Sequence, residues 1–341
     1  MKLRFWVVLV GIVSVGAACS SGPSATTHVP ASTSTTTATV TTSTVVTTLT
    51  TTTMSTTLGG VPTVPFSVPV GDNGVTYDLA GEPSSGPTSF VVLEDGSVVI
   101  ADTMAVRFGE PRLLRFDAAG ARLDPIVLTL AEVASIVDVA SDGQKIAVLD
   151  VYPAMDRYRV LVLDASGDVE TIYDVPNGFH LEDGLTGLAW DDSGVLLEME
   201  WGARYARVAS GGPFESTRTV VFDGTPITIT PGAGLTTVVE VGPASFDVVR
   251  NVEMGGASLI GLAPDGSILL VIDEVGMSDE GGIEVTRRVQ RYTPTGDLTG
   301  EVSFLVRQFV GIARTLEATA DGRVAHLVTL EDRVEIRILD L

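Results

Sequence analysis

The sequence is poor in the residues that form disulfides, metal sites and redox centres. Its 341 residues include one cysteine and three histidines. One cysteine cannot form a disulfide within the chain, so stability must come from a packed core. The histidines, His28, His180 and His326, are scattered, which argues against a zinc or haem site built on imidazole ligands. The chain also lacks a G-x-S-x-G nucleophile elbow and a phosphate-binding glycine loop.

Basic residues are also scarce. The 21 lysines and arginines stand against 43 aspartates and glutamates, which gives a formal net charge of −22. A chain this acidic repels the phosphates of nucleic acids and lacks the basic stripe that binds them. The same charge disfavours docking onto anionic lipid headgroups. We therefore expect no nucleic-acid partner, and any attachment to a membrane must use a separate device.

The N-terminal residues supply such a device. Two basic residues precede an apolar run from Phe5 to Val15, and the small residues Gly16-Ala17-Ala18 lead to Cys19. This is the layout of a secretory signal peptide, and the run is too short to span a membrane. The segment Gly16-Ala17-Ala18-Cys19 resembles a bacterial lipobox in which glycine replaces the usual leucine. We expect residues 1–18 to be removed and Cys19 to carry lipid; the alternative is ordinary signal-peptidase cleavage.

Residues 19–60 are predicted to form a tether. From Ser20 to Leu58 the chain consists mainly of threonine and serine and has no charged residue. This composition cannot form a packed core and is typical of a disordered or glycosylated stalk. At a rise of about 3 Å per residue, it would hold a domain on the order of 100 Å from its anchor. Gly59 to Ser67 then reads as a hinge. We expect an exported domain in the cell envelope, facing the extracytoplasmic side and touching the membrane through lipid alone.

Beyond Gly60 the chain repeats one antiparallel unit. In its clearest copy, Ser89 to Leu93 and Val98 to Asp102 flank a tight DG turn. Arg112 to Phe116 follows as a third strand that ends in a D-x-x-G turn, and Pro125 to Leu128 follows as a fourth. Four such strands form one blade of a β-propeller.

The unit returns about six times with a period of roughly 30 to 55 residues, which is typical of propellers and other arrays. The last copy has only three strands, whereas the orphan segment Val75 to Ala80 precedes the first full copy. Pairing that segment with the last blade would close the ring and remove an open sheet edge. We predict an all-β, monomeric propeller over residues 61–341, with six blades of four strands; five and seven blades are the alternatives.

The first unit also resembles a known family. Its segments DGSVVIADT, Asp95 to Thr103, and RLLRFDAAG, Arg112 to Gly120, are similar to repeats of NHL-type and TolB-like six-bladed propellers. The resemblance covers most of the repeat region and implies this fold and a binding role. Later units depart from the pattern, because the third has Glu198 and Glu200 at the strand end and the last has Thr329.

The two faces of the predicted propeller carry different loops. Turns between the first and second strands of a unit, and between the third and fourth, are short and uniform. Loops between the second and third strands are long and variable, and we call the face that carries them the long-loop face. Because recognition residues usually lie on irregular loops held by a rigid scaffold, we expect the functional surface there.

Second strands end at the long-loop face in carboxylates. The candidates are Asp102, Asp150, Glu200 and Asp273, with Trp201 beside them. A ring of such acids would hold Ca²⁺ or a cationic ligand; the alternative is that each accepts backbone N–H bonds within its own loop. For Trp201 the alternatives are stacking on a ligand and packing between blades.

These patterns predict a binding module for a protein, a small molecule or a carbohydrate, without a catalytic residue that can be named. The alternative is an enzyme, either a Ca²⁺-assisted hydrolase or lactonase or a sugar-active protein that uses channel carboxylates. The fold alone does not decide between them. Apart from that Ca²⁺, the sequence predicts no cofactor. A purely structural spacer would have no pocket on the long-loop face.

Overall fold

The computed structural model describes residues 63–72, 74–79, 86–103, 111–128, 135–152, 157–208, 214–278 and 281–341. The chain divides into two units, residues 1–57 and 58–341, and every described residue belongs to the second. The predicted signal peptide, Cys19 and the tether up to residue 60 lie outside the described residues. No helix in the described part of the chain has the length and apolarity that a membrane crossing requires.

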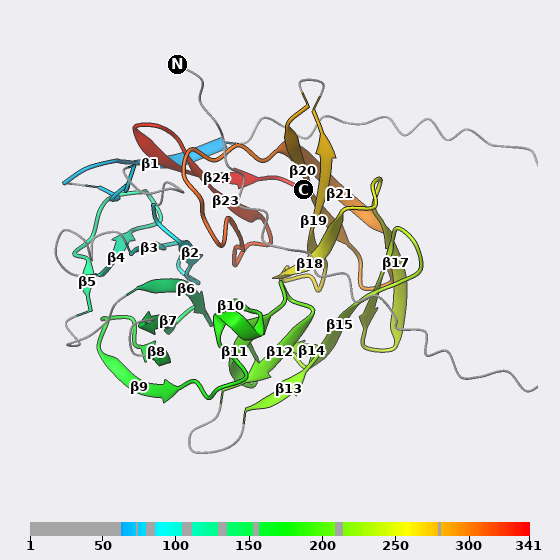
Figure 1. Cartoon of the computed structure of the whole chain (residues 1–341), viewed down its shortest axis with the longest axis horizontal. Coiled ribbons are helices and arrows are strands. Elements are labelled where there is room, and N and C mark those ends of the chain that lie inside the picture. Colours follow the sequence, from blue (N-terminus) through cyan, green and yellow to red (C-terminus); the bar gives the residue numbers. More distant parts are fainter. Residues whose placement is uncertain are drawn as a thin grey trace, which may run out of the picture. The chain divides into compact units, whose positions relative to one another are not determined.

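Six four-stranded antiparallel sheets follow one another around an axis (Figure 1). Blade 1 contains β2 (Ser89–Val92), β3 (Val98–Asp102), β4 (Arg112–Phe116) and β5 (Ile126–Val127). Blade 2 contains β6 (Ile136–Ser141), β7 (Ile146–Tyr152), β8 (Arg157–Leu163) and β9 (Val169–Asp174). Blade 3 follows a short 3-10 helix, η2 (Leu181–Asp183), and contains β10 (Leu185–Asp191), β11 (Gly194–Met199), β12 (Arg204–Arg207) and β13 (Glu215–Thr217).

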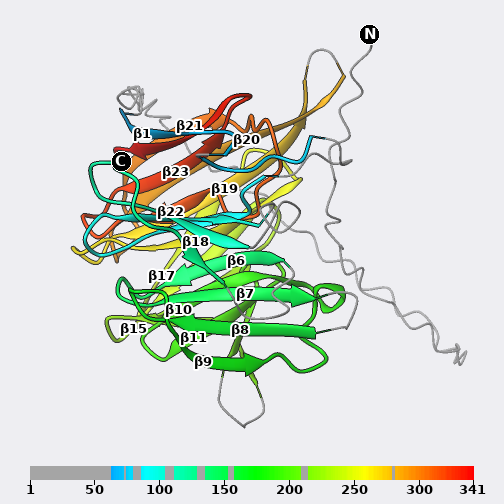
Figure 2. The same ribbon diagram turned by 90° about the vertical axis from the view of Figure 1, so that its left-hand side faces the viewer.

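The second half of the ring repeats this order. Blade 4 contains β14 (Thr219–Phe222), β15 (Thr225–Pro231), β16 (Thr236–Val241) and β17 (Ala244–Val249). Blade 5 contains β18 (Gly255–Leu262), β19 (Ile268–Met277), β20 (Ile283–Tyr292) and β21 (Leu298–Leu305). Blade 6 contains β22 (Leu316–Ala318), β23 (Val324–Thr329), β24 (Arg333–Leu339) and β1 (Thr63–Pro69). Figure 2 shows the strands of blade 2 in order, from the inner β6 to the outer β9. The predicted six-bladed propeller is confirmed.

Blade 6 closes the ring with a strand from the start of the domain. β1 pairs antiparallel with β24, and Phe66 and Pro69 lie opposite Ile336 and Arg333. The predicted closure is therefore confirmed, but the predicted segment is wrong. Val75 makes only an isolated bridge, and the closing strand is Thr63–Pro69, which overlaps the expected hinge.

The error comes from the prolines of β1, at positions 65 and 69. Proline has no N–H to donate and normally marks a loop, but an outermost strand has a partner on one side only and tolerates it. The strand is held by packing as well as by its ladder. Val68 is buried within the apolar cluster that joins blades 6 and 1.

The blades pack face to face through alternating apolar side chains. Along β3, Val98 and Ile100 belong to the cluster shared with blade 6, whereas Val99 and Ala101 belong to the cluster shared with blade 2. Successive residues of a strand point to opposite faces of its sheet. The inner strands of each blade are therefore buried on both faces of their sheet. This explains why the second strand of each unit is a nearly continuous apolar run in the sequence.

The glycine that ends the turn between the third and fourth strands has a packing role in blades 1, 2 and 5. It has a positive φ angle, and it lies against the outermost strand of the preceding blade. A Cβ atom added at Gly120, Gly167 or Gly296 would lie 2.4, 2.6 or 2.5 Å from Phe66, Ile126 or Phe246. No real Cβ atom tolerates such contacts, so the repeated glycine allows neighbouring blades to approach.

We predict that removing β1 destabilises the domain. A chain that starts at residue 71 lacks β1 and leaves the edge of β24 unpaired, whereas a chain that starts at residue 63 keeps the closure. Loss of the buried Val68 side chain alone should lower the free energy of unfolding by about 2 kcal/mol or more. Thermal unfolding and size-exclusion chromatography compare the two chains. Equal melting temperatures would show that the ring does not depend on this strand.

Candidate functional site

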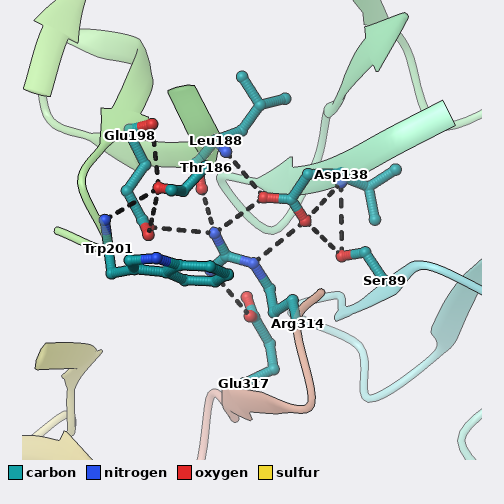
Figure 3. A network of polar contacts seen from close by, with 9 residues as sticks. Ser89, Asp138, Thr186, Leu188, Glu198, Trp201, Arg314 and Glu317 are labelled. Atoms are coloured by element: carbon teal, nitrogen blue, oxygen red, sulfur yellow. Dashed lines mark hydrogen bonds and ion pairs between the residues drawn. The ribbon is translucent and has the colours of Figure 1, made fainter. Parts of the chain in front are cut away.

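One arginine, Arg314, lies at the axis where the inner strands of several blades meet (Figure 3). It lies two residues before β22, and its backbone N–H donates to the carbonyl of Thr88, next to β2 of blade 1, at 3.2 Å. Its guanidinium donates from Nε and Nη2 to the two carboxylate oxygens of Asp138 on β6, at 3.2 and 3.0 Å. Nη2 also donates to the carbonyl of Leu188 on β10 and lies 3.4 Å from Glu198 on β11. Arg314 therefore joins blades 1, 2, 3 and 6.

The carboxylate of Asp138 is buried and fully bonded. It is 1% exposed, and it accepts hydrogen bonds from the Ser89 hydroxyl at 2.5 Å and the Leu188 N–H at 2.7 Å, besides those from Arg314. Gly187 leaves room for it, because a Cβ there would lie 2.3 Å from Oδ2. A buried charge is tolerated only when it is paired and hydrogen-bonded, and this one is both.

Two further carboxylates share the same arginine. Glu198 and Glu317 lie 3.4 and 3.8 Å from its nitrogens. Burial, opposed in part by Arg314, raises the pKa of Glu317 to about 8. Burial likewise raises the pKa of Glu198, and the charge of Asp138 adds to this effect. Burial alone would lower the pKa of Arg314, but the three acids raise it above its ordinary value. The cluster thus has one cation and three acids, and Glu317 keeps its proton at neutral pH.

This cluster separates two cavities along the axis. The long-loop cavity, of about 150 Å³, is lined by Trp201 from the β11–β12 loop and by residues 313–315 from the connection into β22, so it lies at the long-loop face. The short-turn cavity, of about 100 Å³, reaches the other ends of β6 and β14. Glu198, Tyr205 and Arg314 line both cavities. They form the floor of the long-loop cavity.

Trp201 lies at the mouth of the long-loop cavity. Its side chain is 52% exposed, and Glu200 and Trp201 have φ angles of 53° and 57°, which few residues other than glycine adopt. The N–H of Trp201 donates to the Thr186 hydroxyl at 3.1 Å, and that hydroxyl donates to the carbonyl of Glu198 at 3.2 Å. The strained turn is therefore fixed to the floor of the cavity, and Figure 3 shows the indole next to the Glu198 carboxylate.

Tyr205 presents a polar group to the cavity without a partner. Its side chain is 6% exposed and lies opposite Glu198 in the β11–β12 ladder, yet its hydroxyl makes no hydrogen bond within the described part of the chain. Burial, and then the charge of Glu198, raise the pKa of Tyr205 above its ordinary value, so it is a neutral phenol. Gly202 leaves the space beside the hydroxyl open, because a Cβ there would lie 3.1 Å from its oxygen.

Two of the sequence candidates do not reach either cavity. Asp102 is fully buried and accepts hydrogen bonds from Nε of Arg112 at 2.9 Å and from the backbone N–H of Thr76 at 3.0 Å. Asp150 is fully buried and pairs with Arg159, which lies opposite in the β7–β8 ladder. Each of these two carboxylates is thus bonded to an arginine of the adjacent strand.

The other three candidates lie near the mouth. Asp273 and Trp201 line the long-loop cavity, and Asp273 is held by Arg287 through two hydrogen bonds of 2.6 and 2.7 Å. Glu200 lies outside it, with 60% of its side chain exposed and 3.6 Å from Arg204. Regular strand alternation would place Trp201 on the opposite sheet face from Glu198, but the positive φ angles of Glu200 and Trp201 interrupt that alternation.

The described residues offer no carboxylate set for Ca²⁺. Among them, no three side chains of Asp, Glu, His or Cys lie close enough together to hold a metal ion. The cation at the axis is instead the guanidinium of Arg314, which Asp138 and Glu198 contact.

Comparison with known proteins adds little beyond the fold. No protein-family model and no curated protein matches the chain. Several solved structures are similar to it, and three of them follow. Hydrazine synthase of Kuenenia stuttgartiensis has 12% identity, with 71% of this chain and 76% of that chain covered and a TM-score of 0.40. A putative 6-phosphogluconolactonase from Bacteroides uniformis has 15% identity, with 75% and 85% covered and a TM-score of 0.38. The WD40 β-propeller domain of Doa1 has 13% identity, with 81% and 96% covered and a TM-score of 0.42.

These likenesses are too remote to carry an argument about function. The six-bladed fold stands on the strand pairing of this chain. The resemblance of its repeats to NHL-type and TolB-like propellers stays a prediction about family.

We predict that Arg314→Met destabilises the fold severely. The substitution leaves Asp138 buried without its cation, and breaking a buried pair in this way costs about 3–5 kcal/mol. The matched control is Arg323→Met, because Arg323 pairs with Asp321 where their side chains are 47% and 55% exposed. That change should cost about 1 kcal/mol or less. Urea denaturation measures both, and similar losses would contradict the role of Arg314.

We also predict that Glu317 makes the protein less stable in alkaline solution. The pKa of Glu317 is raised from 4.5 to about 8 in the folded chain. Its contribution to the free energy of unfolding is therefore fully present below the pKa of the unfolded chain, and it is lost as the pH rises through the pKa of the folded chain. Glu317→Gln should therefore reduce the fall in stability between about pH 5 and about pH 9 by at least about 1.4 kcal/mol, the value of one pKa unit. Urea midpoints at both pH values measure this. The exposed Glu331→Gln is the control, and an equal effect of the two variants would refute the assignment.

Proposed function

We propose that this protein is an exported, lipid-anchored propeller that binds a small ligand in the long-loop cavity, without catalysis. Support for export and anchoring comes from the apolar run that ends at Cys19 and from the uncharged tether that follows. A tethered domain of this kind would display its cavity outside the membrane, where it meets solutes of the cell envelope or the medium.

The hydroxyl of Tyr205 is the observation that carries the proposal, because it has no partner in the described part of the chain and belongs to a side chain that is only 6% exposed and lines the cavity. The hydroxyl opens on the cavity, so its hydrogen-bond partner must come from the contents of the cavity, and a ligand there would supply one. The setting is that of a ligand site, with a concave space, an aromatic ring at the rim and a few converging polar groups.

Binding is favoured over hydrolysis because the carboxylates of the cavity are already engaged. Asp138 and Asp273 are held by Arg314 and Arg287, each through two hydrogen bonds. Neither is free to act as a nucleophile or a general base without breaking an ion pair. Glu198 is held less closely, by single hydrogen bonds of 3.4 Å from Arg314 and Thr186, and one carboxylate is fewer than the two that glycosidases use.

We predict that small ligands stabilise the protein through this cavity. A panel of short amines, alcohols, sugars and carboxylic acids is screened by thermal shift. At least one compound should raise the melting temperature, and Ser258→Trp, which fills the lining near Gly202, should abolish the rise. Trp190→Phe, on the short-turn cavity, should preserve it. If no compound acts, or if the rise persists in Ser258→Trp, the cavity is not the binding site.

A further inference from the structure

The charges around the long-loop cavity do not balance. The lining contains the acids Asp138, Glu198 and Asp273 but only two cations, Arg287 and Arg314. Asp138 and Asp273 each receive two hydrogen bonds from an arginine, as described above. Glu198 is paired less closely, because it accepts single hydrogen bonds of 3.4 Å from Nη2 of Arg314, which already serves Asp138, and from the Thr186 hydroxyl. The surplus negative charge of the cavity therefore belongs to Glu198.

Tyr205 supplies a second, independent indication of a ligand at the same place. It faces Glu198 across the β11–β12 ladder, it is 6% exposed, and its hydroxyl has no partner in the described part of the chain. A neutral phenol both donates and accepts hydrogen bonds. A ligand group with N–H donors and a positive charge would donate a hydrogen bond to the phenol oxygen. The same group would neutralise the adjacent carboxylate of Glu198.

Anionic ligands do not fit this lining. The donors of Arg314 point to Asp138 and Leu188, and those of Arg287 point to Asp273 and Thr315. A phosphate or carboxylate would have to displace one of these bonds while lying near Glu198. A neutral alcohol or sugar would fit sterically but would leave the charge of Glu198 uncompensated.

The rim and the size of the cavity restrict the ligand further. Trp201 is half exposed at the mouth, and the face of an indole attracts cations and packs against alkyl groups. The cavity measures about 150 Å³, whereas sites for drug-sized molecules usually measure about 300–1,000 Å³. The ligand is therefore small, with a few carbon atoms attached to its charged group.

We propose that the long-loop cavity binds a short primary ammonium compound, whose N–H groups contact Glu198 and Tyr205 and whose carbon chain packs on Trp201. This inference rests on the proposed function, because it names the ligand class of the same site. Ser258 also lines the cavity, and its Cβ lies near the space that Gly202 leaves open.

The ionisation of Glu198 links binding to pH. The groups that face it are Arg314, Asp138, Glu317 and Tyr205. Burial, opposed by Arg314 and reinforced by Asp138, raises the pKa of Glu198 above its ordinary range. Protonation removes the charge that the ammonium requires, so affinity is lost as the pH falls through that raised pKa.

Three probes of equal length test the inference: n-butylammonium, 1-butanol and butyrate. The protein is the full mature chain with Trp190→Phe, in which Trp201 is the remaining tryptophan once the signal peptide with Trp6 is removed. Binding is followed by Trp201 fluorescence and calorimetry. We expect n-butylammonium to bind at least about 10-fold more tightly than either analogue, a difference of about 1.4 kcal/mol.

Variants locate the contacts. Glu198→Gln should weaken n-butylammonium binding about 10-fold or more and remove the loss of affinity that the wild-type protein shows as the pH falls. Tyr205→Phe should weaken it several-fold. Tyr292→Phe is the matched control and should leave affinity unchanged, because its hydroxyl bonds to Gln290 away from the cavity. Thermal unfolding confirms that each variant is folded.

The possible results separate the two proposals. Tighter binding of 1-butanol or butyrate, or binding of n-butylammonium that Glu198→Gln does not change, overturns the ammonium inference and leaves the proposed function standing. The same holds if only sugars or acids from the wider panel bind in the cavity. If no compound of any class binds there, the proposed function fails as well.

Discussion

The ion pair between Arg314 and Asp138 is the constraint on which the centre of this propeller depends. Six sheets arranged around an axis leave a space that their inner strands do not fill, and here a guanidinium occupies part of it. Placing the charge there is costly, and the cost is offset because the bonds of the pair come from blades 1, 2, 3 and 6. Apolar side chains of the same volume would make the fold about as stable. They would not, however, accompany the excess negative charge of Glu198. The arginine thus sets both the rigidity of the floor and the negative charge above it.

Sequence periodicity was enough to predict the ring and not enough to predict its centre. The alternation and turns of each unit are local, so they gave six blades and closure, and the misplaced closing strand resulted from two prolines that an outer strand accommodates. The contacts of Arg314 join residues 126 and 176 positions apart, a separation that no pattern in one sequence reveals. One signal was present. Asp138 interrupts an otherwise apolar inner strand, and a charge at such a position indicates a buried partner.

The repeat motif itself describes packing more than function. The glycine of the D-x-x-G turn is required because the outer strand of the preceding blade lies against it, and the acids that end β3 and β7 bond to arginines on the adjacent strand. The glycine contact recurs in blades 1, 2 and 5, whereas a Cβ added at Gly242, in the same turn of blade 4, would meet no atom within 4 Å. The cavity, by contrast, is built from positions that differ between blades, such as Trp201, Tyr205 and Arg314. This difference explains why the resemblance of the repeats implies architecture without a ligand.

The pairing of β1 with β24 also has a consequence for how the chain matures. The first strand of the domain leaves the ribosome long before the last, since Phe66 and its partner Ile336 are separated by nearly the whole domain. Contacts of such high sequence separation form slowly, and unpaired edges invite association with other chains in the meantime. Blades 1 to 5 can assemble from neighbouring segments as they emerge, but the sixth must wait for the C-terminus. Synthesis therefore imposes an order of events in which the earliest strand is the last to find its place.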